Sequence, residues 1–375
     1  MGNANSSIVY AFRCKDYDVS TIYNMIKTAV ENLGGFSSLF KNGNKILLKP
    51  NLLAPDPPNT ATTTHPAVFE AVAKLLLDSG FKVSYGDSPS FHSMETAAKK
   101  SELKAVADRI GIETADFTIG KKIFVKEAKQ NKYFTVANAF FENDYIVSLP
   151  KLKTHALTTF TGAIKNQFGC VPGRSKSSYH VKLDEVDKFS QMLVDLTIFL
   201  KPELYIMDGI LGMEGNGPRR GNPVNLGILL VSTDPVALDT VATRLVGINP
   251  YDVKTSVKGQ ESGLGTMENI DIRGDIDRKT TLKNFKLPKK DPFTSLPKGL
   301  RKAIENFTIP KPIFNYSKCI KCHECYEICP TEPKSIFIDD ENYPEYIYKT
   351  CIKCYCCLEN CPAGAIYLKI MPFRR

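Results

Sequence analysis

The residues of this chain best suited to chemistry are eight cysteines near its C-terminal end. They occur in two copies of one pattern, C-x2-C-x2-C-x3-C-P, at residues 319–330 and, 32 residues further along, at residues 351–362. This spacing is typical of [4Fe–4S] binding, because three closely spaced thiolates can wrap three corners of one cubane. The fourth thiolate, carried away by the turn before proline, reaches the other cluster.

The two runs therefore predict two clusters with exchanged fourth ligands. One ligand set is Cys319, Cys322, Cys325 and Cys361, and the other is Cys351, Cys354, Cys357 and Cys329. We interpret Cys356, which is out of phase with the run, as a spare thiol. We interpret His323, between two ligands, as a surface histidine.

Two other uses of cysteine fit this pattern poorly. Zinc sites use well-separated C-x2-C pairs with four ligands for each ion. A disulfide framework needs an oxidising compartment, and the sequence shows no secretory signal and no apolar run of about 20 residues for a membrane span. Only three of the eleven cysteines lie outside the ligand sets. We expect a cytoplasmic protein of a reducing, low-oxygen setting.

Positive charge is concentrated just before the cysteine runs. Residues 278–305 hold nine lysines and arginines but two acids, an excess of seven out of the chain's net charge of +9. Three prolines there indicate an extended connector. It is either a solvated linker, the interpretation we favour, or a docking strip for an acidic redox partner. Nucleic acid is a poor candidate, because no basic helix or basic–aromatic pattern accompanies the strip.

The rest of the chain must position whatever this module serves, and its pattern predicts an α/β domain. Short apolar runs alternate with amphipathic stretches, which favours a mostly parallel sheet with flanking helices. The expected strands are residues 44–50, 81–85, 144–149, 203–207 and 227–231, and the expected helices are residues 66–80, 93–110, 186–200 and 235–246.

Ligands of such sheets bind where strands end and loops begin. Three unusual loops follow predicted strands and carry polar or basic residues that suit an anion, carboxylate or phosphate. The candidate binding residues are Lys49, Asp87, Ser88, Lys151, Lys153, Lys165, Asn166, Arg174 and Lys176. His155 and His180 are the candidates for proton transfer. The alternative is that these lysines are ordinary surface charges.

A fourth loop, residues 208–221, is rich in glycine. Its spacing matches neither a P-loop nor a dinucleotide fingerprint. Asp208 and Glu214 are candidates for a base or a metal ligand, although an acid in such a turn more often shapes the turn.

Taken together, these loops resemble domain-of-unknown-function family 362. The matching stretches are Lys-Pro-Asn at 49–51, Gly-Asp-Ser-Pro at 86–89, Leu-Pro-Lys-Leu-Lys-Thr-His at 149–155, Thr-Gly-Ala-Ile-Lys-Asn-Gln-Phe-Gly at 161–169 and Ser-Thr-Asp-Pro-Val-Ala-Leu-Asp at 232–239. The resemblance covers roughly residues 8–275. It implies a prokaryotic protein and an architecture that often ends in a two-cluster ferredoxin module, but no assigned reaction.

The predicted organisation is an α/β domain at 1–277, a basic linker at 278–305 and a small α+β, ferredoxin-like two-cluster domain at 306–375. The first functional hypothesis is a redox protein that feeds low-potential electrons to an anionic substrate in the α/β domain, which would make it an iron–sulfur oxidoreductase. The second is a non-enzymatic electron carrier or assembly factor that docks an acidic partner protein. A third, that the clusters only stabilise the fold, is disfavoured because two coupled cubanes exceed what a staple needs.

Overall fold

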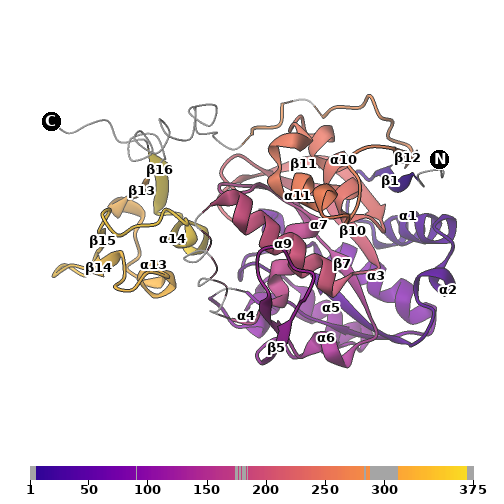
Figure 1. Ribbon diagram of the computed structural model, residues 1–375, viewed down its shortest axis with the longest axis horizontal. Helices are drawn as coiled ribbons and strands as arrows, with labels where there is room; N and C mark the ends of the chain where they lie inside the picture. The colour runs from indigo at the N-terminus through magenta and orange to yellow at the C-terminus, as the bar shows by residue number, and fades with distance from the viewer. Residues whose placement is uncertain are drawn as a thin grey trace.

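The structure is a computed structural model. It describes residues 6–369, except residues 90, 174–175, 177–178, 180–182, 184, 283 and 288–310. Within these residues the chain forms a large α/β domain and a small C-terminal module, drawn in yellow in Figure 1.

Ten strands of the described residues form one mixed sheet in the large domain, in the order β12-β1-β11-β10-β7-β2-β3-β4, with β8 and β9 attached to β10. The centre is parallel: β2 (Lys45–Pro50) pairs with β3 (Lys82–Tyr85) and β7 (Tyr145–Leu149), and β7 pairs with β10 (Leu204–Glu214). The predicted, mostly parallel sheet is therefore confirmed. The remaining strands of this sheet are β1 (Ser7–Arg13), β4 (Glu113–Thr114), β8 (Lys151–His155), β9 (Thr159–Thr161), β11 (Asn222–Ser232) and β12 (Ile270–Gly274).

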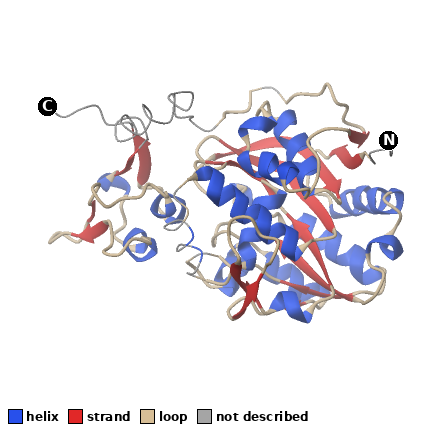
Figure 2. Ribbon diagram, viewed as in Figure 1, coloured by secondary structure: helices blue, strands red, loops and turns tan. Residues whose placement is uncertain are grey.

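Helices cover both faces of the sheet (Figure 2). Alternation along the strands provides apolar side chains for both: Ile206 of β10 belongs to the core beneath α1 and α3, whereas Tyr205 and Met207 pack with α10. The principal helices are α1 (Val19–Asn32), α3 (Pro66–Asp78), α4 (Met94–Lys100), α5 (Leu103–Ile110), α9 (Val186–Leu200), α10 (Pro235–Leu245) and α11 (Lys254–Glu261).

Side chains cap the starts of two of the predicted helices. The His65 side chain accepts a hydrogen bond from the Ala67 N–H at the start of α3, and Asp234 accepts from Val236 and Ala237 at the start of α10. In both helices proline occupies the first turn, where its missing N–H costs nothing.

Three expectations about elements were wrong. The helix predicted over 93–110 is two helices, because Glu102 adopts a left-handed φ of 65° between them. Residues 151–155, expected in a loop, form strand β8. Strand β10 continues to Glu214, so the first half of the fourth loop is strand; antiparallel β11 supplies its partner along that length.

Short elements complete the large domain. They are α2 (Phe36–Leu39), α6 (Ala139–Glu142), α7 (Ala163–Asn166), the β5 (Gly120–Phe124) and β6 (Tyr133–Ala137) hairpin, and the 3-10 turns η1 (Pro58–Thr60), η2 (Gln167–Cys170) and η3 (Pro250–Asp252).

The C-terminal module holds two helices and two small antiparallel ladders. Helices α13 (Glu324–Ile328) and α14 (Cys356–Asn360) lie in corresponding places of the two cysteine runs. The ladders are β13 (Lys311–Phe314) with β16 (Ile366–Lys369), and β14 (Ile336–Ile338) with β15 (Pro344–Tyr346), and a 3-10 turn, η4 (Tyr316–Lys318), follows β13. Helix α14 lies on the side of the module that faces the α/β domain (Figure 1).

The basic connector lies mainly outside the described residues, since residues 283 and 288–310 are not described. Its described start is attached to the large domain: the Lys286 N–H donates to Glu214 Oε2 at 2.7 Å, and the Gly215 N–H donates to the Lys286 carbonyl at 2.8 Å. In the described part of the chain, no helix is long and apolar enough to cross a membrane.

Candidate functional site

The cysteines of the C-terminal module surround two small cavities of about 20 Å³ each. One is lined by Cys319, Cys322, Cys325 and Cys361, and the other by Cys329, Cys351, Cys354 and Cys357. These are the two exchanged sets expected from the spacing. Among the described residues no group of three or more His, Cys, Asp or Glu side chains is arranged to hold a single metal ion.

The two runs share one backbone conformation. Lys321 and His323 of the first run have φ values of 56° and 58°, and their counterparts Lys353 and Tyr355 have 55° and 62°. Left-handed backbone at non-glycine residues is unfavourable, so its repetition at matching positions marks a conformation that both runs require. It lets each run curl around its cavity.

Polar hydrogens also reach the sulfurs. The Ala365 N–H donates to Cys361 Sγ at 3.2 Å, and the Tyr346 hydroxyl lies 3.2 Å from Cys357 Sγ. Hydrogen bonds to cluster sulfurs are among the features that set the potential of iron–sulfur sites. The donor set and these contacts fit iron–sulfur clusters.

A larger cavity, of about 70 Å³, lies between the α/β domain and the module. Six of the nine candidate binding residues line it: Asp87, Ser88, Lys153, Lys165, Asn166 and Lys176. The module contributes Ile328 of α13 and Cys356, Glu359 and Asn360 of α14 to the same lining. The cavity is therefore closed by both parts of the chain, and the volume suits a small molecule or several waters.

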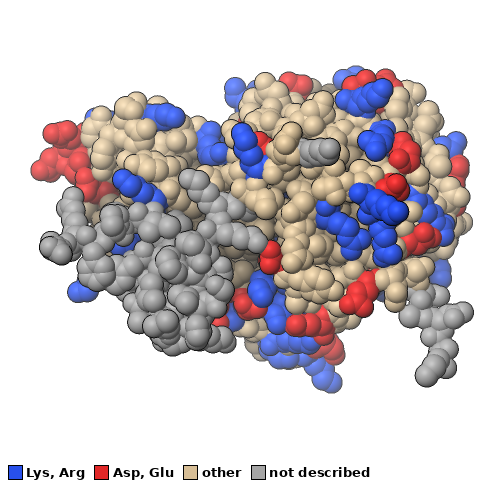
Figure 3. Space-filling model, turned by 90° about the horizontal axis from the view of Figure 1, so that it is seen from above, with Lys and Arg blue, Asp and Glu red and all other residues tan. Residues whose placement is uncertain are grey.

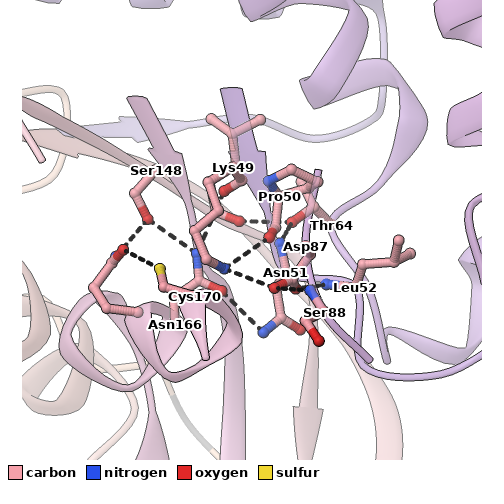
Figure 4. A network of polar contacts seen from close by, with 12 residues as sticks. Lys49, Pro50, Asn51, Leu52, Thr64, Asp87, Ser88, Ser148, Asn166 and Cys170 are labelled. Atoms are coloured by element: carbon pink, nitrogen blue, oxygen red, sulfur yellow. Dashed lines mark hydrogen bonds and ion pairs between the residues drawn. The ribbon is translucent and has the colours of Figure 1, made fainter. Parts of the chain in front are cut away.

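A polar network holds the floor of this cavity (Figure 4). Asp87 accepts hydrogen bonds from Lys49 Nζ at 3.0 Å and from the Leu52 N–H at 2.7 Å. A second chain runs from Ser148 through Asn166 and Asn51 to Lys153 Nζ, with contacts of 2.9, 3.1 and 2.7 Å. These bonds fix the orientation of the buried polar groups.

One glycine makes this packing possible. A Cβ at Gly169 would lie 1.8 Å from Asp87 Oδ1 and 2.8 Å from Lys49 Nζ. Only glycine allows the backbone of η2 to approach the Lys49–Asp87 ion pair so closely.

Burial changes the protonation of the lysines in the lining. Burial, together with the charges of the neighbouring Lys165 and Lys151, lowers the pKa of Lys153 to about 7. Burial likewise lowers the pKa of Lys176 to about 7, and its Nζ donates to the Ser88 carbonyl. On the opposite wall, burial raises the pKa of Glu359 to about 7, with Lys165 and Lys153 opposing that rise.

Two groups of the lining have unused polar atoms. The Thr161 side chain is buried, and its hydroxyl has no hydrogen-bond partner among the described residues. The Lys165 side chain takes part in none of the hydrogen bonds or ion pairs found in the described part of the chain. Burial lowers the pKa of its amine, and the nearby Glu359 opposes that shift, so a bound anion would favour the charged form. Both atoms are available to a bound ligand.

His155 is buried behind the cavity rather than in its lining. Its Nδ1 accepts from the N–H groups of Leu157 and Thr158 at 3.0 and 3.2 Å, so the proton of the neutral ring belongs on Nε2. Nε2 lies 3.2 Å from Glu359 Oε1. This candidate for proton transfer thus reaches the cavity only through Glu359.

The structure does not bring Lys151 into the cavity. Its ammonium forms an ion pair with Asp208 Oδ2 at 2.6 Å and lies 3.1 Å from the Tyr17 hydroxyl. Asp208 in turn accepts from the His65 N–H at 2.9 Å. Asp208 is therefore a buried structural acid and Glu214 fixes the connector at Lys286. Arg174 and His180 lie outside the described residues.

The charges of this site are not a surface feature. Lys49, Lys151, Lys153 and Lys176 are all buried. The surface seen in Figure 3 carries charges of both signs over the α/β domain, from lysines and arginines and from aspartates and glutamates. The alternative that the predicted lysines are ordinary surface charges is wrong for these four.

Sequence reasoning missed the module's part of the site. Glu359, Cys356, Asn360 and Ile328 join the cavity only because α14 packs on the α/β domain. No sequence pattern gives that docking. Asn51 and Thr161 also line the cavity and were not among the candidates. Both lie in the stretches 49–51 and 161–169 that supplied other candidates, so the position of these stretches after predicted strands could have indicated them.

Fold and cysteine geometry define an iron–sulfur protein in which a ferredoxin-type module is docked on an α/β domain. Residues 311–362 match the family model of the 4Fe-4S dicluster domain, and residues 46–244 match the model of the Domain of unknown function (DUF362). The chain belongs to the DUF362 family, and the predicted resemblance is confirmed.

The chain is also similar to two known proteins. The chain is 33% identical over 305 residues to the thylakoid-associated protein sll1697 of Synechocystis, covering 80% of this chain and 94% of that protein. A stretch of 34 residues is 53% identical to pyruvate synthase subunit PorD of Pyrococcus furiosus, covering 9% of this chain and 30% of PorD.

Among solved structures, the lactate racemase apoprotein of Thermoanaerobacterium thermosaccharolyticum is similar at a TM-score of 0.39 and 11% identity. The match covers 61% of this chain and 54% of the racemase. At that level the likeness carries no argument about activity.

Proposed function

We propose that this protein delivers low-potential electrons to a small anionic substrate bound in the cavity between its two parts. The observation that carries the proposal is the shared lining: lysines of the α/β domain form one wall, and residues next to cluster ligands form the other. Cys356 adjoins Cys357, and Ile328 adjoins Cys329. A molecule in the cavity would therefore lie beside the module.

The cysteines would hold two [4Fe–4S] clusters, with Cys319, Cys322, Cys325 and Cys361 for one and Cys351, Cys354, Cys357 and Cys329 for the other. When bound, such clusters supply one-electron transfer. The electrons would come from an external low-potential redox protein and end on the bound anion. Because exposed cubanes are oxygen-labile, the proposal includes a reducing, low-oxygen compartment such as an anaerobic cytoplasm.

The chain's own residues would bind and orient the substrate. The Lys165 ammonium and the Thr161 hydroxyl have no partner among the described residues and would bind the anionic group. Lys153 is fixed by Asn51 and by the Thr62 carbonyl, both at 2.7 Å, and would add charge without moving. His155 would hold the Glu359 carboxyl that closes the cavity from the module side.

Lys165→Ala tests this binding role. In anaerobically prepared full-length protein, acetate or phosphate at about one hundred times its Kd should stabilise the fold by about 2.7 kcal/mol. That corresponds to a rise in melting temperature of roughly 5 °C. Lys165→Ala should abolish the rise, and Lys27→Ala on the exposed surface of α1 should keep it. A rise that survives in Lys165→Ala would show that the anion does not bind here.

A second candidate is a non-enzymatic electron carrier that docks an acidic partner. The excess of seven positive charges in residues 278–305 favours it, and the Lys286 side chain in the described part of that strip is exposed. Electron transfer to such a partner should slow steeply with ionic strength. Turnover of a small molecule that is insensitive to salt would favour the first function.

A further inference from the structure

The two cysteine runs are equivalent in backbone but differ in what neutralises their helix ends. Helices α13 and α14 are each five residues long, start 32 residues apart and end directly before the fourth cysteine of their runs. The last carbonyls of a helix have no partner within it and carry the negative end of the helix dipole. Each run must therefore find hydrogen-bond donors for these carbonyls elsewhere.

The first run uses a lysine of its own module. Lys334 Nζ lies 2.9 Å from the Tyr326 carbonyl, 3.0 Å from that of Glu327 and 3.3 Å from that of Cys329. One ammonium thus covers the end of α13, including the carbonyl of the fourth cysteine.

The second run has no such lysine. Residues 362–365, between its fourth cysteine and β16, are Pro-Ala-Gly-Ala. Its donors come from the α/β domain: Arg219 Nη1 donates to the Asn360 carbonyl at 3.0 Å, and Arg220 Nε donates to the Cys361 carbonyl at 2.8 Å. Arg220 Nη2 donates to the same Cys361 carbonyl. The α/β domain thus provides for the second run what Lys334 provides for the first.

The two arginines differ in whether an acid is paired with them. Arg219 forms a two-point ion pair with Asp56, with contacts of 2.7 and 3.0 Å, so its charge is compensated. Arg220 forms no ion pair with any described residue and is half-buried. It also packs on Gly364, where a Cβ would lie 3.5 Å from Arg220 Cδ. A cation with no direct ion pair among the described residues, and only the more distant acids Asp56 and Glu324 near it, is thereby held against the backbone of Cys361.

We propose that Arg220 is a positioning residue that sets the reduction potential of the cluster held by Cys361, so that this potential depends on docking of the module. The inference rests on the cluster assignment of the proposed function. A nearby positive charge stabilises the reduced, more negative state of a cluster, and partial burial weakens its screening by water. Lys334 has the same role for the cluster held by Cys329, but independently of docking.

The test is a redox titration, followed by EPR, of the anaerobically reconstituted full-length protein and its variants. Arg220→Gln should lower one of the two midpoint potentials, and Arg220→Lys should restore most of the loss. At a fixed potential the ratio of reduced to oxidised cluster should fall about tenfold, which is about 59 mV for a one-electron couple. Lys334→Gln should lower the other midpoint.

A further variant leaves Arg220 intact and should shift the midpoint potential in the opposite direction. Asp56→Asn removes the counter-charge of Arg219 next to the Asn360 carbonyl, so it should raise the midpoint that Arg220→Gln lowers. Loosened docking alone would not produce opposite shifts from the two substitutions.

Two results would overturn the inference while leaving the proposed function intact. They are unchanged midpoints in Arg220→Gln, and a shift of the same midpoint by Arg220→Gln and Lys334→Gln. A reconstituted protein without any [4Fe–4S] signal would overturn the cluster assignment itself, and the inference with it.

Discussion

Lys153 of strand β8 and Lys165 of helix α7 contribute differently to the cavity. Lys153 is buried and bonded to Asn51 and Thr62, whereas Lys165 presents an ammonium without a described partner. The first is a fixed charge whose protonation depends on its surroundings, and the second is a charge that a ligand can bind directly. These roles lead to separate expectations.

Anion affinity should fall as pH rises through about 7, because burial lowers the pKa of Lys153 to about 7 and an anion binds its ammonium form. The loss should approach tenfold for each pH unit above that value, measured by isothermal calorimetry with acetate. Lys153→Met should weaken binding at pH 6 and make the profile less steep, with Lys176 and Glu359 accounting for the dependence that remains, whereas Lys27→Met should leave the profile unchanged. Equal affinity at pH 6 and pH 9 in the unsubstituted protein would contradict this role.

The same pKa has a consequence for stability. In the unfolded chain this lysine keeps its proton up to about pH 10.5, whereas in the folded chain it loses it near pH 7. Between these values the unfolded state binds more protons, so the free energy of unfolding should rise with pH over that window. Burial of Lys153 therefore costs stability at low pH.

At the scale of elements, the long strands β10 and β11 do more than extend the sheet. Their far ends carry the turn at residues 215–221, which presents Arg219 and Arg220 to the end of α14. The turn is held close to β8, since the Gly217 N–H donates to Thr154 Oγ1 at 3.2 Å. Docking of the module thus depends on how closely this turn approaches β8.

Gly217→Ala should weaken that docking. A Cβ at Gly217 would lie 2.1 Å from the Thr154 carbonyl oxygen, which belongs to rigid backbone, so the turn must move away. Amide hydrogen exchange in α14 should become at least several-fold faster. Gly247→Ala is the matched control: it also changes a glycine, at φ 75° and with nothing within 4 Å of the new Cβ, and should lower stability by about 1 kcal/mol without altering α14. Unchanged exchange in both variants would show that the turn does not control docking.

At the scale of the whole molecule, docking and electron content are expected to be linked. If docking raises the potential of one cluster through Arg220, reduction must strengthen docking by the same factor, because coupling between two equilibria is reciprocal. The cavity is closed by the docked module, so reduction would also favour the closed cavity. Substrate would then be held most firmly when electrons are available.

Hydrogen exchange measures this linkage directly. Dithionite reduction of the reconstituted protein should slow exchange at residues 215–221 and in α14 by up to about tenfold, and Arg220→Gln should remove most of the difference. Strand β2, buried in the centre of the sheet, provides the internal reference. Equal protection in the oxidised and reduced forms would argue against linked docking.

Local sequence pattern was enough to predict the features of this protein that depend on residues close together in the sequence. The exchanged cysteine sets follow from spacing within two runs of twelve residues. The α/β sheet follows from alternating apolar runs. These features depend on residues that are neighbours along the chain, so they can be predicted from the sequence.

Tertiary structure decided the rest, because it depends on contacts between residues far apart. Lys151 and Lys153 are two positions apart on β8, and residues at that spacing share one face of a strand. Yet Lys151 pairs with Asp208 whereas Lys153 lines the cavity, and the register of β8 against β10 shifts between these two residues. Glu359 enters the site from a helix 194 residues beyond Lys165, and Arg220 reaches a carbonyl 141 residues away. The sequence alone determined that iron–sulfur chemistry belongs to this chain; the docking of α14 determined which residues stand beside it.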